Sequence, residues 1–160
     1  ELTPNARKLA ERLRQSEEGF MQESKTKVPR SKKSAVLRVR RLAGKRLTFM
    51  LRAEDDTLRE FAEDAKTGRA AKTLVKEGPL RITMVALRKG TVLPPHHVEG
   101  AISIHIIRGC LRLTTDRGDM DVPEGHLIAL GPGVVHSPKA HDDCAILLTF
   151  AMQQESQRIS

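Results

Sequence analysis

The stretch Gly90-Thr-Val-Leu-Pro-Pro-His96-His97-Val98-Glu99-Gly100-Ala101 decides how the rest of the chain is interpreted. An apolar run ends just before Gly90, a Pro-Pro pair turns the chain, and two adjacent histidines follow. Forty residues after the first of them, His136 lies in the segment Gly131-Pro-Gly-Val-Val-His136-Ser-Pro. The main functional question is therefore whether these histidines hold a metal, line a pocket or do neither.

The sequence around this stretch has the pattern of many short strands. From Ala70 onward, apolar runs alternate with Gly and Pro turn signals at short intervals. Such spacing favours an antiparallel sandwich or a closed barrel over alternating strands and helices, so the predicted fold class is all-β. The predicted strands are 70–76, 79–88, 101–107, 110–115, 126–130 and 143–152.

The strand predicted at 101–107 shows which residues face the interior. Side chains alternate between the two faces of a strand, so Ile102, Ile104 and Ile106 share one face. Ser103, His105 and Ile107 share the other face. The first face is purely aliphatic and is predicted to be internal, whereas the second is predicted to lie outward or at a subunit contact.

At this point the residues resemble the cupin superfamily, whose members are small jelly-roll β-barrels. The first cupin motif begins with a Gly, five residues and a His, and Gly90 and His96 match it. Where the motif continues with a second histidine and a glutamate, this chain has Val98 and Ile102. The second motif matches Gly125 and His136, with Gly131 in place of a proline. The resemblance covers residues 70–152 and is greatest to small single-domain bacterial cupins whose metal-binding motifs are degenerate.

The resemblance implies a site inside the barrel, with two interpretations left open. In the first, a small molecule binds without catalysis in an aliphatic pocket marked by His96 and His136, which Val98, Ile102 and Ile104 also line. In the second, the chain is a metal-dependent enzyme of oxygenase or isomerase type that holds Fe, Mn, Ni, Cu or Zn. That interpretation needs the Pro-Pro turn to shift the register, so that His97 joins the two histidines and Glu99 supplies a carboxylate.

The N-terminal third has a different composition. Residues 1–50 hold 14 Lys/Arg and 5 Asp/Glu, a net charge of +9, whereas residues 51–160 hold 14 and 15, a net charge of −1. A basic extension that is partly disordered or helical is predicted over 1–50, with a helix at 4–20, a linker at 21–35 and one or two edge strands within 36–52. A short helix and a connection are predicted over 51–69, with Asp55-Asp56-Thr57 capping a helix from Leu58 to Ala65. A polar tail occupies 153–160.

Composition also indicates partners and compartment. The extension could bind nucleic acid through nonspecific charge, which gives a third hypothesis in which the extension docks and the barrel senses.

Cys110 and Cys144 lie in apolar runs without a CxxC pair, as is typical of small buried residues in a reducing compartment. No apolar run is long enough to span a bilayer, so we expect a cytoplasmic protein with no membrane partner. We also expect a homodimer, because strands 70–76 and 79–88 offer aliphatic faces that one small barrel does not fully cover.

Overall fold

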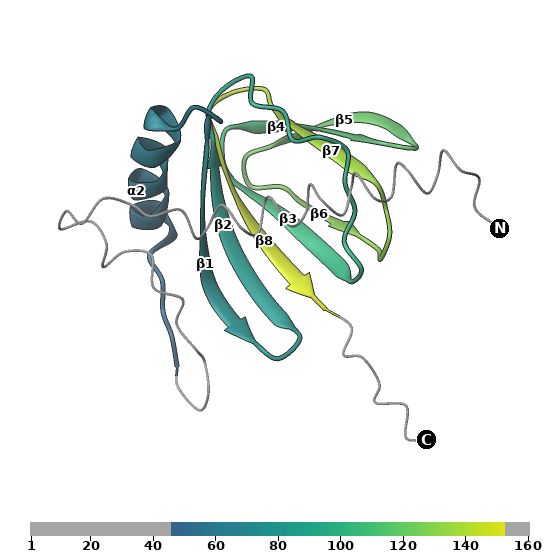
Figure 1. The fold of residues 1–160 in the computed structure, drawn as a ribbon, viewed down its shortest axis with the longest axis horizontal. Coiled ribbons are helices and arrows are strands. Elements are labelled where there is room, and N and C mark those ends of the chain that lie inside the picture. The colour runs from purple at the N-terminus through teal and green to yellow at the C-terminus, as the bar shows by residue number, and fades with distance from the viewer. Residues whose placement is uncertain (1–45, 153–160) are drawn as a thin grey trace.

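Two antiparallel sheets face each other across an aliphatic interior. The computed structural model describes residues 46–152, and the predicted helix at 4–20, the linker at 21–35 and the tail at 153–160 lie outside them. One sheet has the strand order β1-β2-β8-β3-β6 and the other has the order β5-β4-β7. Figure 1 shows the two sheets around a common interior, with α2 outside the larger one. The elements are α2 (Leu51–Asp64), β1 (Arg69–Glu77), β2 (Leu80–Leu87), β3 (Ala101–Arg108), β4 (Cys110–Thr115), β5 (Gly118–Pro123), β6 (Leu127–Leu130), β7 (His136–Ala140) and β8 (Cys144–Ala151).

The six predicted strands are confirmed with nearly the predicted bounds, and two further strands were not predicted. One is β5, an edge strand of the smaller sheet in which only Val122 is buried. The other is β7, whose sequence His-Ser-Pro-Lys-Ala carries neither β-branched nor aromatic residues. β7 lacks an apolar alternation and β5 has only the short one of Met120 and Val122, so pairing with β4 holds both strands in place.

The predicted register of β3 is confirmed. Ile102, Ile104 and Ile106 are at most 4% exposed and pack inside the barrel with residues of the smaller sheet. The opposite face of the larger sheet packs against α2, where Leu58 and Ala62 join a second cluster that includes Ile107. The outward face of β3 is thus covered in part by a helix of the same chain.

The helix differs from its prediction. It begins at Leu51 and not at Leu58, so Asp55 lies inside the helix and caps nothing. The Asp55 carboxylate, 5% exposed, accepts hydrogen bonds from Arg108 at the end of β3, with Nε–Oδ2 and Nη2–Oδ1 distances of 2.6 and 3.0 Å. The prediction of an edge strand within 36–52 is wrong for residues 46–52. Residues 46–50 form neither helix nor strand, and residues 51–52 are the start of the helix.

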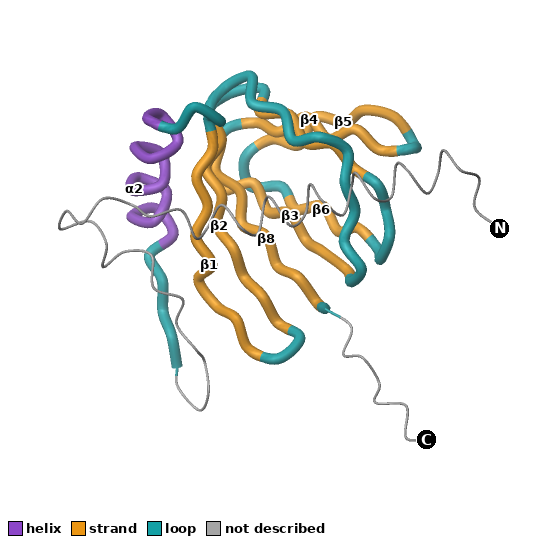
Figure 2. The backbone as a smooth tube through the Cα atoms, viewed as in Figure 1, coloured by secondary structure: helices purple, strands orange, loops and turns teal. Residues whose placement is uncertain are grey.

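The loop between β2 and β3, residues 88–100, runs from one end of the barrel to the other (Figure 2). It lies beside β7, because Val92 is bridged to Lys139 and His96 to His136. The two halves of the histidine pattern are therefore brought together by backbone pairing. Within residues 46–152 no helix is long and apolar enough to cross a membrane.

Candidate functional site

A cavity of about 230 Å³ lies between the two sheets. Its walls are mostly hydrocarbon and come from β2, β3 and β8, with the histidine pair on the side of the smaller sheet. The structure places every residue that the sequence assigned to the pocket at this one cavity. These residues are His96, Val98, Ile102, Ile104 and His136.

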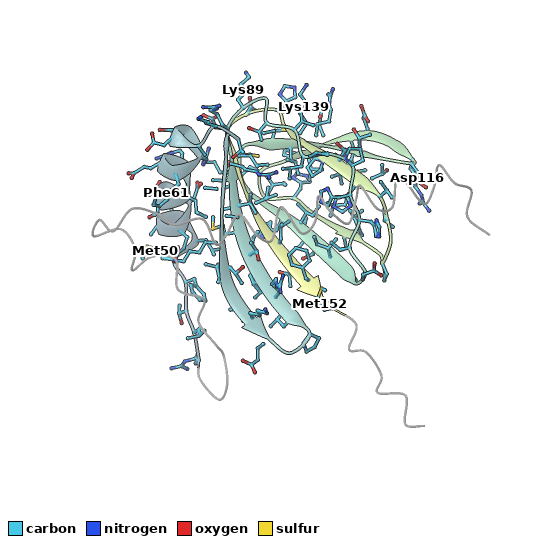
Figure 3. All side chains as sticks on the ribbon, in the orientation of Figure 1. Met50, Phe61, Lys89, Asp116, Lys139 and Met152 are labelled. Carbon is cyan, nitrogen blue, oxygen red and sulfur yellow. The ribbon has the colours of Figure 1, made fainter. Side chains whose placement is uncertain are left out.

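The cavity opens at the end of the barrel where β3 begins and β8 ends. Glu99 and Met152 line it and are exposed, and they flank the paired residues Ala101 and Ala151. Figure 3 shows Met152 at the end of the molecule opposite Lys89 and Lys139. The open end of the cavity is therefore the end that carries Met152.

Four polar side chains that sequence reasoning missed also line the cavity. Thr73 of β1 and Thr83 of β2 face each other across the sheet with their hydroxyl oxygens 3.3 Å apart. Arg69 and Arg81 belong to the same wall. The sequence Arg81-Ile-Thr83-Met-Val85 does indicate that Arg81, Thr83 and Val85 share one face of β2, because side chains alternate along a strand.

The histidine pair is fixed by the backbone. The His96 amide donates to the His136 carbonyl at 3.0 Å, and the His136 amide donates to the His96 carbonyl at 2.8 Å. The ring centroids are 4.3 Å apart and the rings are tilted by 57°.

The two imidazoles are held in the same way. His96 Nδ1 lies 2.8 Å from the Pro94 carbonyl oxygen, and His136 Nδ1 lies 2.9 Å from that of Val134. His136 is 2% exposed, and this burial lowers its pKa below the ordinary value of 6.5. The nearby His96 lowers that pKa further, while the contact with the Val134 carbonyl raises it.

The four residues predicted to hold a metal do not form one donor set, although His96, Glu99 and His136 all line the cavity. Backbone pairing of His96 with His136 leaves no shift of register at the Pro-Pro turn, so His97 does not line the cavity. Its Nε2 lies 3.7 Å from Oε1 of Glu99, whose side chain is 83% exposed. Within residues 46–152 no group of three or more His, Cys, Asp or Glu could hold a metal. Two imidazoles do not make the set of three or four protein ligands that a first-row transition metal usually needs, so the donor set does not fit such an ion.

The cysteines give no nucleophile at this cavity. Cys144 is buried, and burial raises the pKa of its thiol to about 12, which keeps it protonated. Burial also raises the pKa of Cys110. Both thiols are free, and neither side chain lines the cavity.

Comparisons with known proteins agree on the fold. The sequence matches no protein family and no curated protein. Among solved structures, a conserved protein of unknown function from Streptococcus pyogenes is 27% identical with a TM-score of 0.52, over 56% of this chain and 79% of that one. A cupin superfamily protein from Desulfitobacterium hafniense is 13% identical with a TM-score of 0.52, over 53% and 78%. An RmlC-like cupin from Shewanella frigidimarina is 17% identical with a TM-score of 0.52, over 57% and 83%.

Proposed function

Because β1 to β8 form a cupin jelly-roll barrel, we propose that this chain binds a small, largely apolar molecule in the cavity beside His96 and His136. One observation carries the proposal: a cavity of about 230 Å³ has hydrocarbon walls and few polar groups. Small-molecule sites commonly combine apolar walls with a few placed polar groups that fix orientation. An apolar cavity of about 150 Å³ holds benzene, so this one suits a single ring with a short substituent.

The proposed role is binding without catalysis. The chemical groups at the cavity are two imidazoles, two hydroxyls, two guanidinium groups and one exposed carboxylate. His136 is held neutral by burial, and no cysteine thiol lines the cavity. This set can orient a ligand, and it supplies no paired nucleophile and base.

The test is a titration with single-ring apolar fragments, read on the methyl resonances of isoleucine. We expect at least one fragment to shift the resonances of Ile102 and Ile104, which line the cavity. Ala71→Phe fills the cavity from β1 and should abolish the shifts. Ala129→Phe makes the same change at an exposed position of β6 and should leave them intact. Shifts that persist in Ala71→Phe, or the absence of shifts with every fragment, would contradict the proposal.

A metal-dependent enzyme using His96, His97 and His136 is the alternative. The orientation of the two Nδ1 atoms toward backbone carbonyls favours it, because metal-bound histidines are often held in that way. The position of His97 outside the cavity weighs against it. Binding without a resident metal is therefore the function that this geometry supports best.

A further inference from the structure

The tautomer of His136 can be derived from its surroundings. Its Nδ1 atom lies 2.9 Å from the carbonyl oxygen of Val134. A carbonyl oxygen only accepts hydrogen bonds, so Nδ1 must carry the proton. In the neutral ring, Nε2 then bears a lone pair and can only accept.

His96 reaches the same state by the same contact. Its Nδ1 atom lies 2.8 Å from the Pro94 carbonyl oxygen and therefore donates to it. Nε2 of this ring is also an acceptor when the ring is neutral. The two histidines thus bring two acceptors to the wall of one cavity, with ring centroids 4.3 Å apart.

Two acceptors cannot hydrogen-bond to each other. Within residues 46–152, neither Nε2 atom has a hydrogen-bond partner among the side chains or the backbone. His136 is 2% exposed, so its acceptor is buried as well as unpaired. A buried acceptor without a donor is destabilising, and a donor supplied by a ligand removes that cost.

The rest of the cavity decides what kind of molecule brings the donor. Its walls beside the histidines are hydrocarbon, including Val98, Ile104 and Leu148. At the histidine pair a carboxylate would meet lone pairs and not donors, because burial favours the neutral form of His136; the guanidinium groups of Arg69 and Arg81 lie on the wall formed by β1 and β2. A neutral hydroxyl or N–H group on an apolar ring matches both the acceptors and the walls.

We propose that the cavity selects molecules with an apolar ring and a hydrogen-bond donor, an alcohol, phenol or ring N–H, which binds the paired Nε2 acceptors of His96 and His136. This inference rests on the proposed function, because it concerns the ligand of the same cavity. It adds a chemical requirement that a purely apolar pocket would lack. Ethers and hydrocarbons of similar size, which lack a donor, should bind more weakly than the matching phenol.

The experiment compares 4-ethylphenol, 4-ethylanisole and ethylbenzene by calorimetry on the full chain at pH 7.5. We expect 4-ethylphenol to bind about tenfold more tightly than the other two, the difference that one hydrogen bond to a buried acceptor supplies. Equal affinities for all three probes would overturn the donor requirement and leave the proposed function standing. Binding by none of the three at millimolar concentration would count against the proposed function itself.

Variants assign the preference to the histidine pair. His136→Leu should reduce the tenfold preference to near unity. His126→Leu is the matched control, because His126 contacts the carbonyl of residue 124 in the same manner at 3.3 Å but is exposed and does not line the cavity. A preference that survives His136→Leu would overturn the assignment.

A measurement on the unmodified chain keeps the proposal testable if His136→Leu fails to fold. The ¹⁵N shifts of the His136 ring should show a protonated Nδ1 and an unprotonated Nε2. Adding 4-ethylphenol should shift Nε2 in the direction of an accepted hydrogen bond, and 4-ethylanisole should not. A protonated Nε2 in the free protein would overturn the inference.

Discussion

His136 is a titratable residue whose side chain is buried, so its ionisation must affect the stability of the fold. Because burial lowers its pKa below 6.5, the unfolded chain binds a proton at a higher pH than the folded chain does. The free energy of unfolding is therefore highest above the pKa that His136 has in the unfolded chain. It falls as the pH decreases through 6.5 toward the pKa that His136 has in the folded chain. We expect wild type to lose more stability than His136→Leu between pH 7.5 and pH 5.

Urea denaturation followed by circular dichroism measures this difference. His126→Leu removes an exposed histidine and should follow the wild-type pH dependence. Equal losses of stability in wild type and His136→Leu would show that His136 is not the group responsible.

Val98 and Ile102 occupy positions where the cupin motif carries ligands, and both line the cavity with the two histidines. Val98→His together with Ile102→Glu should create a set of three imidazoles and one carboxylate, the donor set that Zn²⁺ and Ni²⁺ favour. We expect these ions to raise the Tm of the double variant by several degrees and to leave that of wild type unchanged. Ligand at one hundred times Kd adds about 2.7 kcal/mol to the free energy of unfolding. A comparable rise in wild type would revive the metal-dependent alternative.

At the scale of elements, α2 is tied to the end of β3 by the bidentate contact of Asp55 with Arg108. Removing one partner of a buried ion pair leaves the other charge uncompensated. We expect Asp55→Ala to lower the free energy of unfolding by about 3 kcal/mol. Asp56→Ala is the control, because Asp56 is exposed and its contact with Arg59 at 3.3 Å should contribute less than about 1 kcal/mol. Equal effects in chemical denaturation would contradict this account of how the helix is held.

The turn between β3 and β4 depends on the missing side chain of Gly109. Gly109 and Gly125 both have a φ of +79°, which strains any residue with a Cβ. A Cβ on Gly109 would also lie 2.4 Å from the Asp143 carbonyl oxygen, whereas one on Gly125 meets nothing within 4 Å. Gly125→Ala should therefore cost about 1 to 2 kcal/mol, and Gly109→Ala should cost clearly more. Thermal unfolding of the two variants measures the difference, and equal Tm values would show that the turn relaxes.

The elements that sequence patterns predicted are those whose own residues explain their burial. β3 alternates buried and partly buried residues and β8 is apolar along most of its length, and the bounds of both are predicted to within about one residue. β7 carries no such pattern, because its position follows from pairing with β4 and with the loop that holds His96. The start of α2 was missed for a related reason, since Asp55 binds a side chain of a distant strand.

For the whole molecule, the site was predicted only where the two motifs reach it. His96 and His136 could be found from glycine and proline spacing. Thr73 and Thr83 were missed: strand alternation puts Thr83 on one face with Arg81 and Val85, but it does not say which face of the sheet meets the other sheet. The homodimer stays a prediction, and its original basis has changed: α2 packs on the aliphatic outer face of β1 and β2 within one chain.

The chain also separates charge along its length. Of the 14 Lys/Arg in residues 1–50, 13 precede residue 46, and these basic residues lie outside the part that the structure describes. We expect the full chain to elute from heparin at higher salt than a chain that begins at residue 46, because released counterions scale with the cations engaged. Elution of both at the same salt would remove the extension from any account of nucleic-acid binding. Ligand binding should be the same in both, since the cavity is built from residues 69–152.

Strand β2 has one face in the cavity wall, with Thr83 and Val85, and the other against the helix, with Met84 and Ala86. A substitution there disturbs either the cavity wall or the packing of the helix, so few substitutions in this strand should be neutral. In β5, by contrast, residues 118–121 are exposed. Divergence among descendants of this chain should therefore accumulate in the outer hairpin long before it reaches the strand that the cavity wall and α2 share.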